Sequence, residues 1–409
     1  MTKRRRSSYR KLTNLKVNFE MHRPAWHLRP KVANTRRCLD LTGPVRYPYA
    51  RRGPPAMTRG QPNLTRLLLL GESTAGSSPL LTITEIGRAA GFHVQFQAGS
   101  RRPEMWLRQV QQSEAVIFVG YESGPDAAWR LQIAEALDVP VVRWWVGSDV
   151  LACLHDPEEA SAARELSRHI TINLTVAPHL RQELEEIGIR ASVLAIPTHR
   201  PAAMAMPWSH DVARTTLAYL PTDGADFYGA QAVRQLALAC PHLRFIVVAD
   251  TNGDLADLPN VVSLPFVKDM EPIYRQAGSL LRLTRHDGLP RMVLEALGRG
   301  RYVIYSRSYP HCIYADSAEQ AREALAWVSQ QTVGNLDGFA EVSKYDVARD
   351  FLEPLLGILE LCRGLPVRTR MAALTSLPKT AAKAMLASVL GRRKQSRPLR
   401  TSGAPSQSA

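Results

Sequence analysis

The sequence contains few cysteines, five in 409 residues, and they lie far apart. No two of them form a Cys-x-x-Cys pair, and none has a histidine at the spacing of a metal site. A small fold held by disulfides and a structural zinc site are therefore excluded. We expect reduced thiols in a cytoplasmic protein. The five cysteines are Cys38, Cys153, Cys240, Cys312 and Cys362.

Long apolar runs are also missing. The longest, residues 67–71 and 115–120, fall far short of the roughly 18 residues that a membrane-spanning helix needs. The basic N-terminus is not followed by an apolar stretch that would serve as the core of a secretory signal. We therefore expect neither a spanning helix nor export. The expected location is cytoplasmic, with the protein either free or peripheral on the cytoplasmic membrane face.

Acidic residues are almost absent from the two ends of the chain. Residues 1–62 hold 16 Lys and Arg against 2 acids, and residues 363–409 hold 10 against none. The net charge of +15 therefore leaves −9 for the 300 residues between them. A fold that binds nucleic acid carries a basic face on its folded body. We expect no specific nucleic-acid partner, and binding through the tails alone would depend steeply on salt.

Both basic ends have the composition of disordered tails. Residues 1–62 mix Arg and Lys with Pro, Gly and Ser and show neither helical nor strand periodicity. Translation from Met57, just before the first expected strand, is a second interpretation of this segment. In the tail of residues 363–409, residues 374–390 are partly apolar and are followed by three cations at 392–394. That stretch either binds an anionic membrane surface or belongs to a disordered tail.

Between the tails, short apolar runs alternate with amphipathic stretches, which is the pattern of βα units around parallel sheets. We predict an α/β fold of two doubly wound, Rossmann-like domains that face an inter-domain cleft. The first domain covers residues 63–197, a Pro-containing linker covers 198–214, and the second domain covers 215–342. Residues 343–362 should form a closing helix with Ser343 as its N-cap.

The expected elements follow from the same alternation. In the first domain we expect strands at residues 66–71, 93–97, 115–120, 139–145, 169–176 and 192–196, with helices at 80–90, 102–112, 127–137, 157–168 and 178–187. In the second domain we expect strands at 216–220, 245–249, 261–265, 279–283 and 302–306, with helices at 230–239, 270–276, 290–297 and 318–329.

The most informative segment is that of residues 281–304. In it a strand leads into a turn at Asp287-Gly288, Pro290 takes the favoured first position of a helix, and Glu295 follows within that helix. The free amides and positive dipole of a first helical turn attract a phosphate, and the two acids are placed to accept sugar hydroxyls. The alternative is that Asp287 only caps the helix and that Glu295 is an exposed helix acid.

This segment resembles the donor-binding segment of the retaining glycosyltransferases of the group-1, family-four kind, which have the two-domain GT-B fold. The family's hallmark is an acid followed by Gly and, eight positions after that acid, Glu followed by Ala, as in Asp287-Gly288 and Glu295-Ala296. The resemblance implies that Glu295 binds the ribose of the nucleotide. It also implies that Asp287, where the family usually has Glu, contacts the donor sugar. By the same resemblance the first domain binds the acceptor and the second domain binds the donor.

The resemblance extends over residues 64–361. The strand that leads to Gly147-Ser148-Asp149 looks like a strand of the family's first domain, and residues 174–184 look like the strand and helix that follow it. Ile196-Pro197 matches the family's entry to the linker, where Thr198-His199 stands in place of the usual Asn-Gly.

Two features of the family are missing. Its members commonly carry an Arg and a Lys after the first strand of the second domain, which neutralise the diphosphate, but here that strand leads into residues 219–224 without a cation. Arg282, Arg285 and Arg291 are the candidates to replace them, because a leaving diphosphate needs positive charge. The alternative for Arg282 and Arg285 is that they are surface cations that balance the acidic body. Trp145-Val146 stands where a His often lies near the donor sugar, so no catalytic His is transferred.

The activity that the resemblance implies is transfer of a sugar from a nucleotide diphosphate-sugar to an acceptor hydroxyl, with retention. Bacterial polysaccharide or glycolipid synthesis is the expected setting, and the unknown acceptor is a candidate for lipid linkage. A catalytically inactive nucleotide-sugar-binding or scaffold subunit is the alternative. No cofactor is expected besides the nucleotide-sugar as co-substrate. No metal is expected either, because the sequence has no Asp-x-Asp.

The remaining candidates lie in turns that follow strands. Gly71 and Ser73 belong to a small-residue turn whose amides can approach a phosphate or a sugar. Asp149 and Trp145 are expected on the acceptor side of the cleft, with helix capping by Asp149 and burial of Trp145 as the alternatives. The predicted site comprises catalytic Asp287, Arg285 and Arg282; donor-binding Glu295, Gly288, Leu289, Arg291, Gly71 and Ser73; and, for the acceptor, Asp149 and Trp145.

Overall fold

The computed structural model describes residues 66–70, 78–97, 103–120, 125–197, 204–222 and 224–364. Within these ranges the chain forms two parallel sheets of six strands each. The predictions of disorder in residues 1–62, of a start at Met57, and of a membrane-binding stretch at 374–390 lie outside the described residues. The tail predicted at 363–409 is outside them from residue 365 on, and its first two residues belong to the last helix instead.

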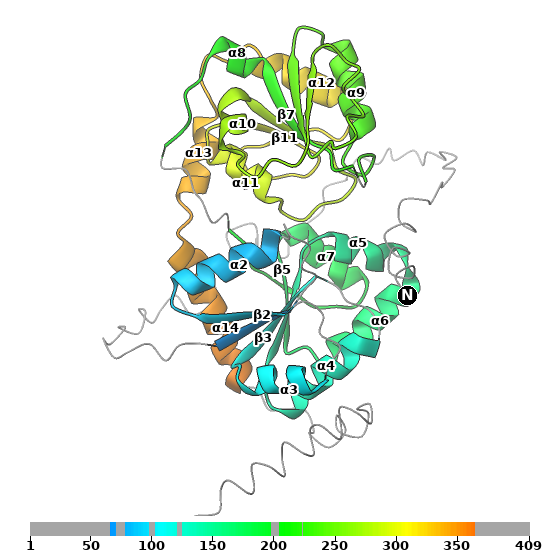
Figure 1. The fold of residues 1–409 in the computed structure, drawn as a ribbon, viewed down its shortest axis with the longest axis vertical. Coiled ribbons are helices and arrows are strands. Elements are labelled where there is room, and N and C mark those ends of the chain that lie inside the picture. Colours follow the sequence, from blue (N-terminus) through cyan, green and yellow to red (C-terminus); the bar gives the residue numbers. More distant parts are fainter. Residues whose placement is uncertain are drawn as a thin grey trace, which may run out of the picture. The chain divides into compact units, whose positions relative to one another are not determined.

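The first sheet has the strand order β2-β1-β3-β4-β5-β6, and helices cover both of its faces (Figure 1). Successive strand residues point to opposite faces, so Leu67 and Leu69 pack on the core under α2, α5 and α7, whereas Leu68 packs under α3 and α4. The strands are β1 (Arg66–Leu70), β2 (His93–Gln97), β3 (Ala115–Val119), β4 (Val141–Trp145), β5 (Ile172–Thr175) and β6 (Ser192–Val193). The helices are α2 (Ser78–Ala89), α3 (Pro103–Gln111), α4 (Pro125–Ala136), α5 (Ser148–His155), α6 (Pro157–Ser167) and α7 (Pro178–Glu186).

The second sheet has the order β12-β11-β10-β7-β8-β9. Ala218 packs on the face covered by α9 and α12, and its neighbour Leu217 packs on the face covered by α10 and α11. The strands are β7 (Thr215–Tyr219), β8 (Arg244–Val248), β9 (Val261–Leu264), β10 (Ser279–Arg282), β11 (Tyr302–Tyr305) and β12 (Ile313–Tyr314). The helices are α8 (His210–Ala213), α9 (Ala230–Ala239), α10 (Glu271–Gln276), α11 (Arg291–Leu297), α12 (Ala318–Val328) and α13 (Leu336–Ser343), followed by η1 (Ala348–Leu352) and α14 (Glu353–Gly364).

Each sheet contains one point at which the strand order reverses. In the first sheet β1 has β2 on one side and β3 on the other, and in the second sheet β7 has β8 on one side and β10 on the other. Ligands of open α/β sheets bind beside the carboxyl ends of the strands at such a point. The second reversal places the end of β7 at Tyr219 beside the end of β10 at Arg282.

The predicted fold class of two doubly wound domains is confirmed, and a strand forms at each position where one was expected. The short elements β12, α5, α8 and α13 were not predicted. The prediction that Ser343 caps the closing helix is wrong, because Ser343 is the last residue of α13. Asn335 caps α13 instead, and its Oδ1 accepts a hydrogen bond of 2.9 Å from the amide of Gly338. The closing segment consists of η1 and α14.

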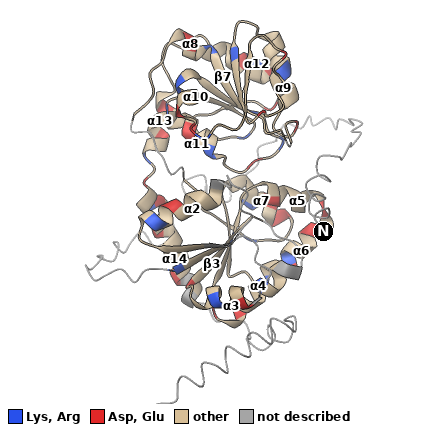
Figure 2. Cartoon of the chain, viewed as in Figure 1, with Lys and Arg blue, Asp and Glu red and all other residues tan. Residues whose placement is uncertain are grey.

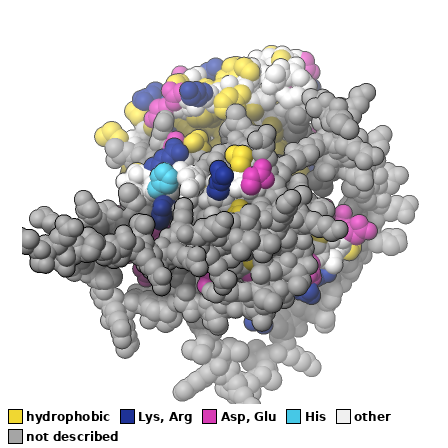
Figure 3. Space-filling model, turned by 60° about the horizontal axis from the view of Figure 1, so that its bottom comes forward, with side chains coloured by type: hydrophobic (Ala, Val, Ile, Leu, Met, Phe, Trp, Pro, Cys, Tyr) yellow, Lys and Arg dark blue, Asp and Glu magenta, His cyan; other side chains and the backbone are white. Residues whose placement is uncertain are grey.

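Charged side chains lie mostly on the helices and loops (Figure 2). Arg143 in β4 and Arg282 in β10 are exceptions, because both are buried within strands. On the face drawn in Figure 3, hydrophobic side chains lie among charged ones. Among the described helices, none combines the length and the hydrophobicity needed to cross a bilayer.

The last part of the described chain returns to the first domain. Phe351 of η1 is 1% exposed and stacks on Trp144 of β4 with ring centroids 5.7 Å apart. Leu355 and Leu359 of α14 belong to the same core as α2, α5 and α7. The core of the first domain is therefore completed by residues that follow the second domain in sequence.

Replacing Phe351 by Ala should lower the free energy of unfolding by about 3–5 kcal/mol, the usual cost of removing a fully buried aromatic ring. Urea denaturation followed by tryptophan fluorescence measures this change. Phe266→Ala is the matched control, because Phe266 is 71% exposed and its loss should change stability little. Equal effects of the two substitutions would contradict the packing of Phe351.

Candidate functional site

The strand reversal of the second sheet carries an ion pair between Arg282 and Asp287. Nε and Nη2 of Arg282 lie 2.9 and 2.8 Å from Oδ2 of Asp287. The other carboxylate oxygen, Oδ1, accepts a hydrogen bond of 3.1 Å from the amide of Gly288. Both side chains are largely buried, at 8% and 17% exposure. The turn after β10 therefore presents a carboxylate that is held at both of its oxygens.

Two tyrosine rings also surround the guanidinium of Arg282. Its central carbon lies 4.8 Å from the ring centre of Tyr228 and 5.5 Å from that of Tyr219. Burial lowers the pKa of Arg282, but the charge and hydrogen bonds of Asp287 outweigh it, so the pKa lies above its ordinary value. Arg282 is thus a permanent cation in a region from which water is largely excluded.

Glu295 forms a second acid–arginine pair, on α11. Its Oε1 accepts from Nη2 and Nε of Arg291 at 2.9 and 3.3 Å, and its Oε2 accepts from the hydroxyl of Tyr274 at 2.9 Å. Burial, followed by the charge and hydrogen bond of Glu295, raises the pKa of Tyr274 well above its ordinary value. Tyr274 is thus a neutral donor. Arg291 also donates from Nη1 to the hydroxyl of Thr82 in α2, at 3.3 Å.

Helix α11 begins one residue later than predicted. Pro290 is its N-cap residue, with extended backbone angles, and Arg291 is the first helical residue. Glu295 therefore lies four residues after Arg291 on the same helix, the spacing at which side chains on one helical face meet. The alternative of an exposed helix acid does not describe Glu295, which is 13% exposed.

The backbone of Gly288 packs directly against the turn that follows β4. A Cβ atom on Gly288 would overlap the carbonyl oxygen of Val146 and lie 2.7 Å from Cγ2 of Val176. Across this contact, Gly147 has a φ of +134°, and a Cβ there would lie 2.8 Å from the Gly288 nitrogen. Leu289 packs against the core of the first domain. The two turns therefore meet through glycines because no larger residue fits at either position.

Asp149 holds the turn of Gly147 in place. Its Oδ1 accepts hydrogen bonds from the amides of Val146, Gly147 and Val150, at 3.0, 2.8 and 3.0 Å. Burial raises the pKa of Asp149, and these backbone bonds oppose the rise. The N-cap of α5 is Gly147, without a side-chain cap, so the capping alternative does not describe Asp149 either. Asp149 lies in the first turn of α5, where its carboxylate holds the preceding turn and is not free for an acceptor.

The assignment of Trp145 to the cleft is corrected by the structure. Trp145 is 0% exposed, its Nε1 donates to Oδ1 of Asn173 at 3.1 Å, and the guanidinium of Arg143 lies 3.5 Å from its ring centre. All five residues of β4 are buried, and the ring of its last residue belongs to the same core as that of Trp144. Trp144, also 0% exposed, donates from Nε1 to the carbonyl of Leu194.

Another predicted residue, Arg285, does not join the two pairs. Arg285 is exposed, and its backbone bonds to Phe227 and Arg307. Of the three candidate arginines, Arg282 and Arg291 are therefore the ones that the structure brings to the acids. Gly71 and Ser73 lie outside the described residues.

Three residues near this segment, two on α7 and one after β10, were not predicted from the sequence. Nε2 of His179 lies 2.7 Å from the carbonyl oxygen of Asp287, and Nε2 of His286 lies 2.8 Å from Oε2 of Glu183. These bonds join positions 108 and 103 residues apart, so no local pattern marks them. The one local indication was Pro178, which starts α7 and so placed His179 and Glu183 in a helix without indicating their partners.

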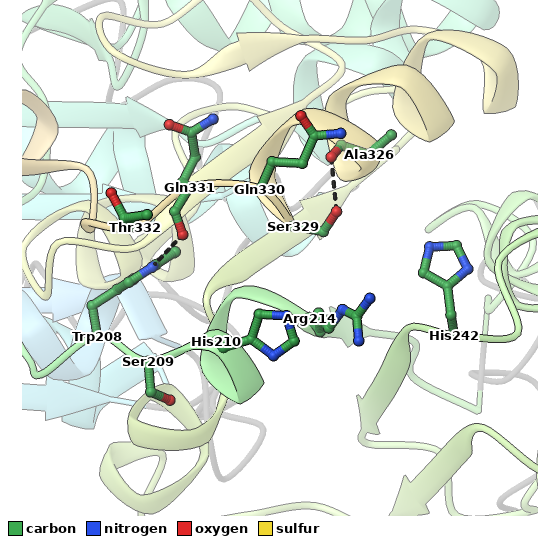
Figure 4. Close-up of a pocket in the computed structure, with 10 residues that line it drawn as sticks. All are labelled: Trp208, Ser209, His210, Arg214, His242, Ala326, Ser329, Gln330, Gln331 and Thr332. Atoms are coloured by element: carbon green, nitrogen blue, oxygen red, sulfur yellow. Dashed lines mark hydrogen bonds between the residues drawn. The ribbon is translucent and has the colours of Figure 1, made fainter.

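A separate hollow of about 680 Å³ lies in the second domain (Figure 4). One side is formed by residues around α8 and the other by the end of α12. None of the paired acids or arginines lines it. The lining residues are Trp208, Ser209, His210, Arg214, His242, Ala326, Ser329, Gln330, Gln331 and Thr332.

No protein-family model and no curated protein sequence matches this chain. Among solved structures, the fold is similar to that of HepE from Anabaena in complex with UDP-glucose, with a TM-score of 0.56 at 12% identity over 73% of this chain and 100% of that one. It is also similar to an alpha-glucosyltransferase in complex with UDP and DNA, with a TM-score of 0.51 at 11% identity over 73% of this chain and 100% of that one. TarM gives a TM-score of 0.50 at 10% identity over 63% of this chain and 57% of that one. The chain thus has the GT-B fold.

Gly288→Ala should lower the free energy of unfolding by about 1–3 kcal/mol, because the added methyl group must displace the backbone of Val146. Urea denaturation measures the change. Gly357→Ala is the control, because a Cβ at Gly357 in α14 would have no heavy atom within 4 Å. That substitution should stabilise the protein by about 0.5–1 kcal/mol, the usual gain of Ala over Gly within a helix. A neutral Gly288→Ala would contradict the close approach.

Proposed function

We propose that this protein is a glycosyltransferase that transfers a sugar from a nucleoside diphosphate-sugar to an acceptor hydroxyl. The observation that carries the proposal is the joint placement of two partly buried acid–arginine pairs, Asp287 with Arg282 and Glu295 with Arg291, at the strand reversal of the second sheet. The GT-B fold and the resemblance of this segment to family-four enzymes support the same function.

Glu295 is proposed to bind the ribose hydroxyls of the donor. A carboxylate accepts two hydroxyl donors at once, and the neutral hydroxyl of Tyr274 and the guanidinium of Arg291 already fix its position. The ribose would then add to, or replace, these donors without moving the carboxylate. The position of Glu295 on α11 matches the acid that binds ribose in the family.

Arg282 is proposed to take the place of the two cations that the family carries after β7. It lies at the end of β10, and β10 pairs directly with β7. The guanidinium therefore stands one strand away from the position where the family's cations would be. A diphosphate that leaves with the nucleotide gains negative charge in the transition state, and a fixed, permanently charged guanidinium in a largely buried site stabilises that charge.

The proposed reaction forms a bond between the acceptor oxygen and the anomeric carbon and breaks the bond from that carbon to the diphosphate oxygen. Because the acceptor oxygen bonds to the anomeric carbon directly, no protein nucleophile is required. The acceptor proton passes to the departing diphosphate, which serves as the base. Asp287 would orient the donor sugar from the turn after β10. Retention is proposed on the resemblance to the family, and independence from metals on the lack of an Asp-x-Asp sequence.

Comparing UDP with uridine separates the two proposed roles. Arg282→Met should weaken UDP binding by roughly tenfold or more, the value of a lost charged hydrogen bond, and should change uridine binding little. Glu295→Ala should weaken both ligands by similar factors, because both contain the ribose. Isothermal titration calorimetry, with uridine measured by competition, gives these affinities.

Two further variants control this comparison. Arg234→Met removes a surface arginine whose Nη1 lies 2.8 Å from Oδ2 of Asp257, and it should leave both affinities unchanged. The double variant Arg282→Met with Asp287→Asn avoids an unpaired buried carboxylate and should keep the weak UDP binding. If the wild-type protein binds no nucleoside diphosphate or diphosphate-sugar from a broad screen, the proposed function is wrong.

The acceptor is proposed to be lipid-linked, in bacterial polysaccharide or glycolipid synthesis, with the protein peripheral on the membrane. The sequence after residue 362 carries 10 basic and no acidic residues, and each cation near an anionic bilayer contributes about 1 kcal/mol of attraction. Such a tail would raise the rate at which the enzyme meets an acceptor held in the membrane.

Removing residues 366–409 should weaken sedimentation with vesicles that contain anionic lipid, at low salt, because most of the tail's positive charge is lost. Affinity for UDP should not change. Neutral vesicles serve as the control, since neither form should bind them. Equal sedimentation of the full-length and shortened proteins with anionic vesicles would exclude this role of the tail.

A further inference from the structure

Helix α7 of the first domain is bonded to the segment that carries Asp287. Nε2 of His286 lies 2.8 Å from Oε2 of Glu183, and His286 is 4% exposed. One residue on, the carbonyl oxygen of Asp287 lies 2.7 Å from Nε2 of His179. Because a carbonyl can only accept, His179 must donate here. The two histidine rings meet edge to face, with centroids 6.4 Å apart.

The charge of Glu183 matches these partners. Its own burial raises its pKa, but the hydrogen bond and charge of His286, and then the charges of His179 and Arg307, outweigh burial and lower it below the ordinary value. Glu183 is therefore an ionised acceptor at neutral pH. The groups that face the pair are His179 on α7, Arg307 after β11, and Asp287 next to His286 in the chain.

The hydrogen bond from His179 to the carbonyl of Asp287 also fixes the orientation of the Gly288 amide. In a trans peptide the C=O and the following N–H point in opposite directions. Holding the carbonyl of Asp287 therefore sets the direction of the Gly288 amide, which donates to Oδ1 of Asp287 at 3.1 Å. Oδ2 of the same carboxylate holds Arg282. The orientation of the Asp287 carboxylate and of the Arg282 guanidinium thus depends on the rotation of the peptide group between Asp287 and Gly288.

We infer that His179 and Glu183 of the first domain, together with their neighbour His286 after β10, are positioning residues, which orient Asp287 and Arg282. The inference rests on the proposed function and extends it to residues outside the family's motif. The glycine contact of Gly147 with Gly288 sets how closely the two turns approach, whereas the histidine bonds set how the Asp287 peptide is rotated. The donor-binding segment is therefore in its working orientation when α7 is docked against it.

Glu183→Ala and His179→Ala test this inference by removing the acceptor of His286 and the donor to Asp287. With UDP-glucose as donor, release of UDP should fall by about ten- to a hundredfold in kcat, the effect of small misplacements at a reacting centre, while KM for the donor changes much less. Glu183→Gln keeps an acceptor oxygen and should restore most of the rate. Hydrogen–deuterium exchange of the Gly288 amide, measured without ligand, should become faster in both Ala variants.

A second His–Glu pair, partly buried, supplies a matched control among the described residues. Nδ1 of His169 lies 2.7 Å from Oε2 of Glu135 within the first domain, at 20% and 17% exposure. Glu135→Ala should change neither kcat nor exchange at Gly288.

The outcomes separate the two proposals. If Glu183→Ala and His179→Ala behave like Glu135→Ala in both measurements, the positioning role is wrong. If the wild type neither binds nor turns over any nucleotide-sugar, the proposed function fails. In that case, unchanged exchange of the Gly288 amide in Glu183→Ala and His179→Ala would also show that α7 does not hold the Asp287 peptide.

Discussion

The ion pair of Arg282 with Asp287 is the contact on which the rest of the site depends. Burying an arginine at the carboxyl end of a parallel strand costs free energy unless an acid neutralises its charge. Asp287, in the turn after β10, is that acid for Arg282. The same carboxylate takes the amide of Gly288, so the ion pair also determines the shape of the turn. Gly288 in turn has to be a glycine because that turn meets Val146.

Both acids of the motif have protein partners in the structure. Glu295 is held by Arg291 and Tyr274, as Asp287 is held by Arg282 and Gly288. A buried carboxylate without partners would take up a proton or move toward solvent. The paired state keeps each acid in place before a ligand arrives. Under the proposed function, binding would then require exchange of hydrogen bonds and little rearrangement of backbone, which limits its entropic cost.

The sequence was sufficient for the fold and for the central motif, because both depend on local patterns. The two faces of β1 can be read from the alternation of its leucines, and the Asp287-Gly288 turn from its place between a strand and a proline. Ser343 was misassigned because Asn335, upstream of it, caps a helix that ends at Ser343 itself. Nothing local distinguishes Trp145 in the core from a tryptophan in a cleft.

Contacts between distant segments were the part that the sequence could not supply. His179 and Glu183 occupy ordinary positions on an amphipathic helix, and their partners are more than 100 residues away. Such pairings depend on how the two sheets pack against each other. No short stretch of the sequence carries a signal for that packing. The roles of Tyr274 and Thr82 were hidden for the same reason.

The return of Phe351, Leu355 and Leu359 to the first domain has a consequence for biosynthesis. A ribosome releases residues 66–197 long before it releases these three side chains, so the nascent first domain emerges with one face of its core uncovered. The second sheet, whose core draws on residues 206–342, can close before the first does. The first domain, although synthesised before the second, therefore completes its core last. An isolated first domain would expose the apolar surface that α14 covers.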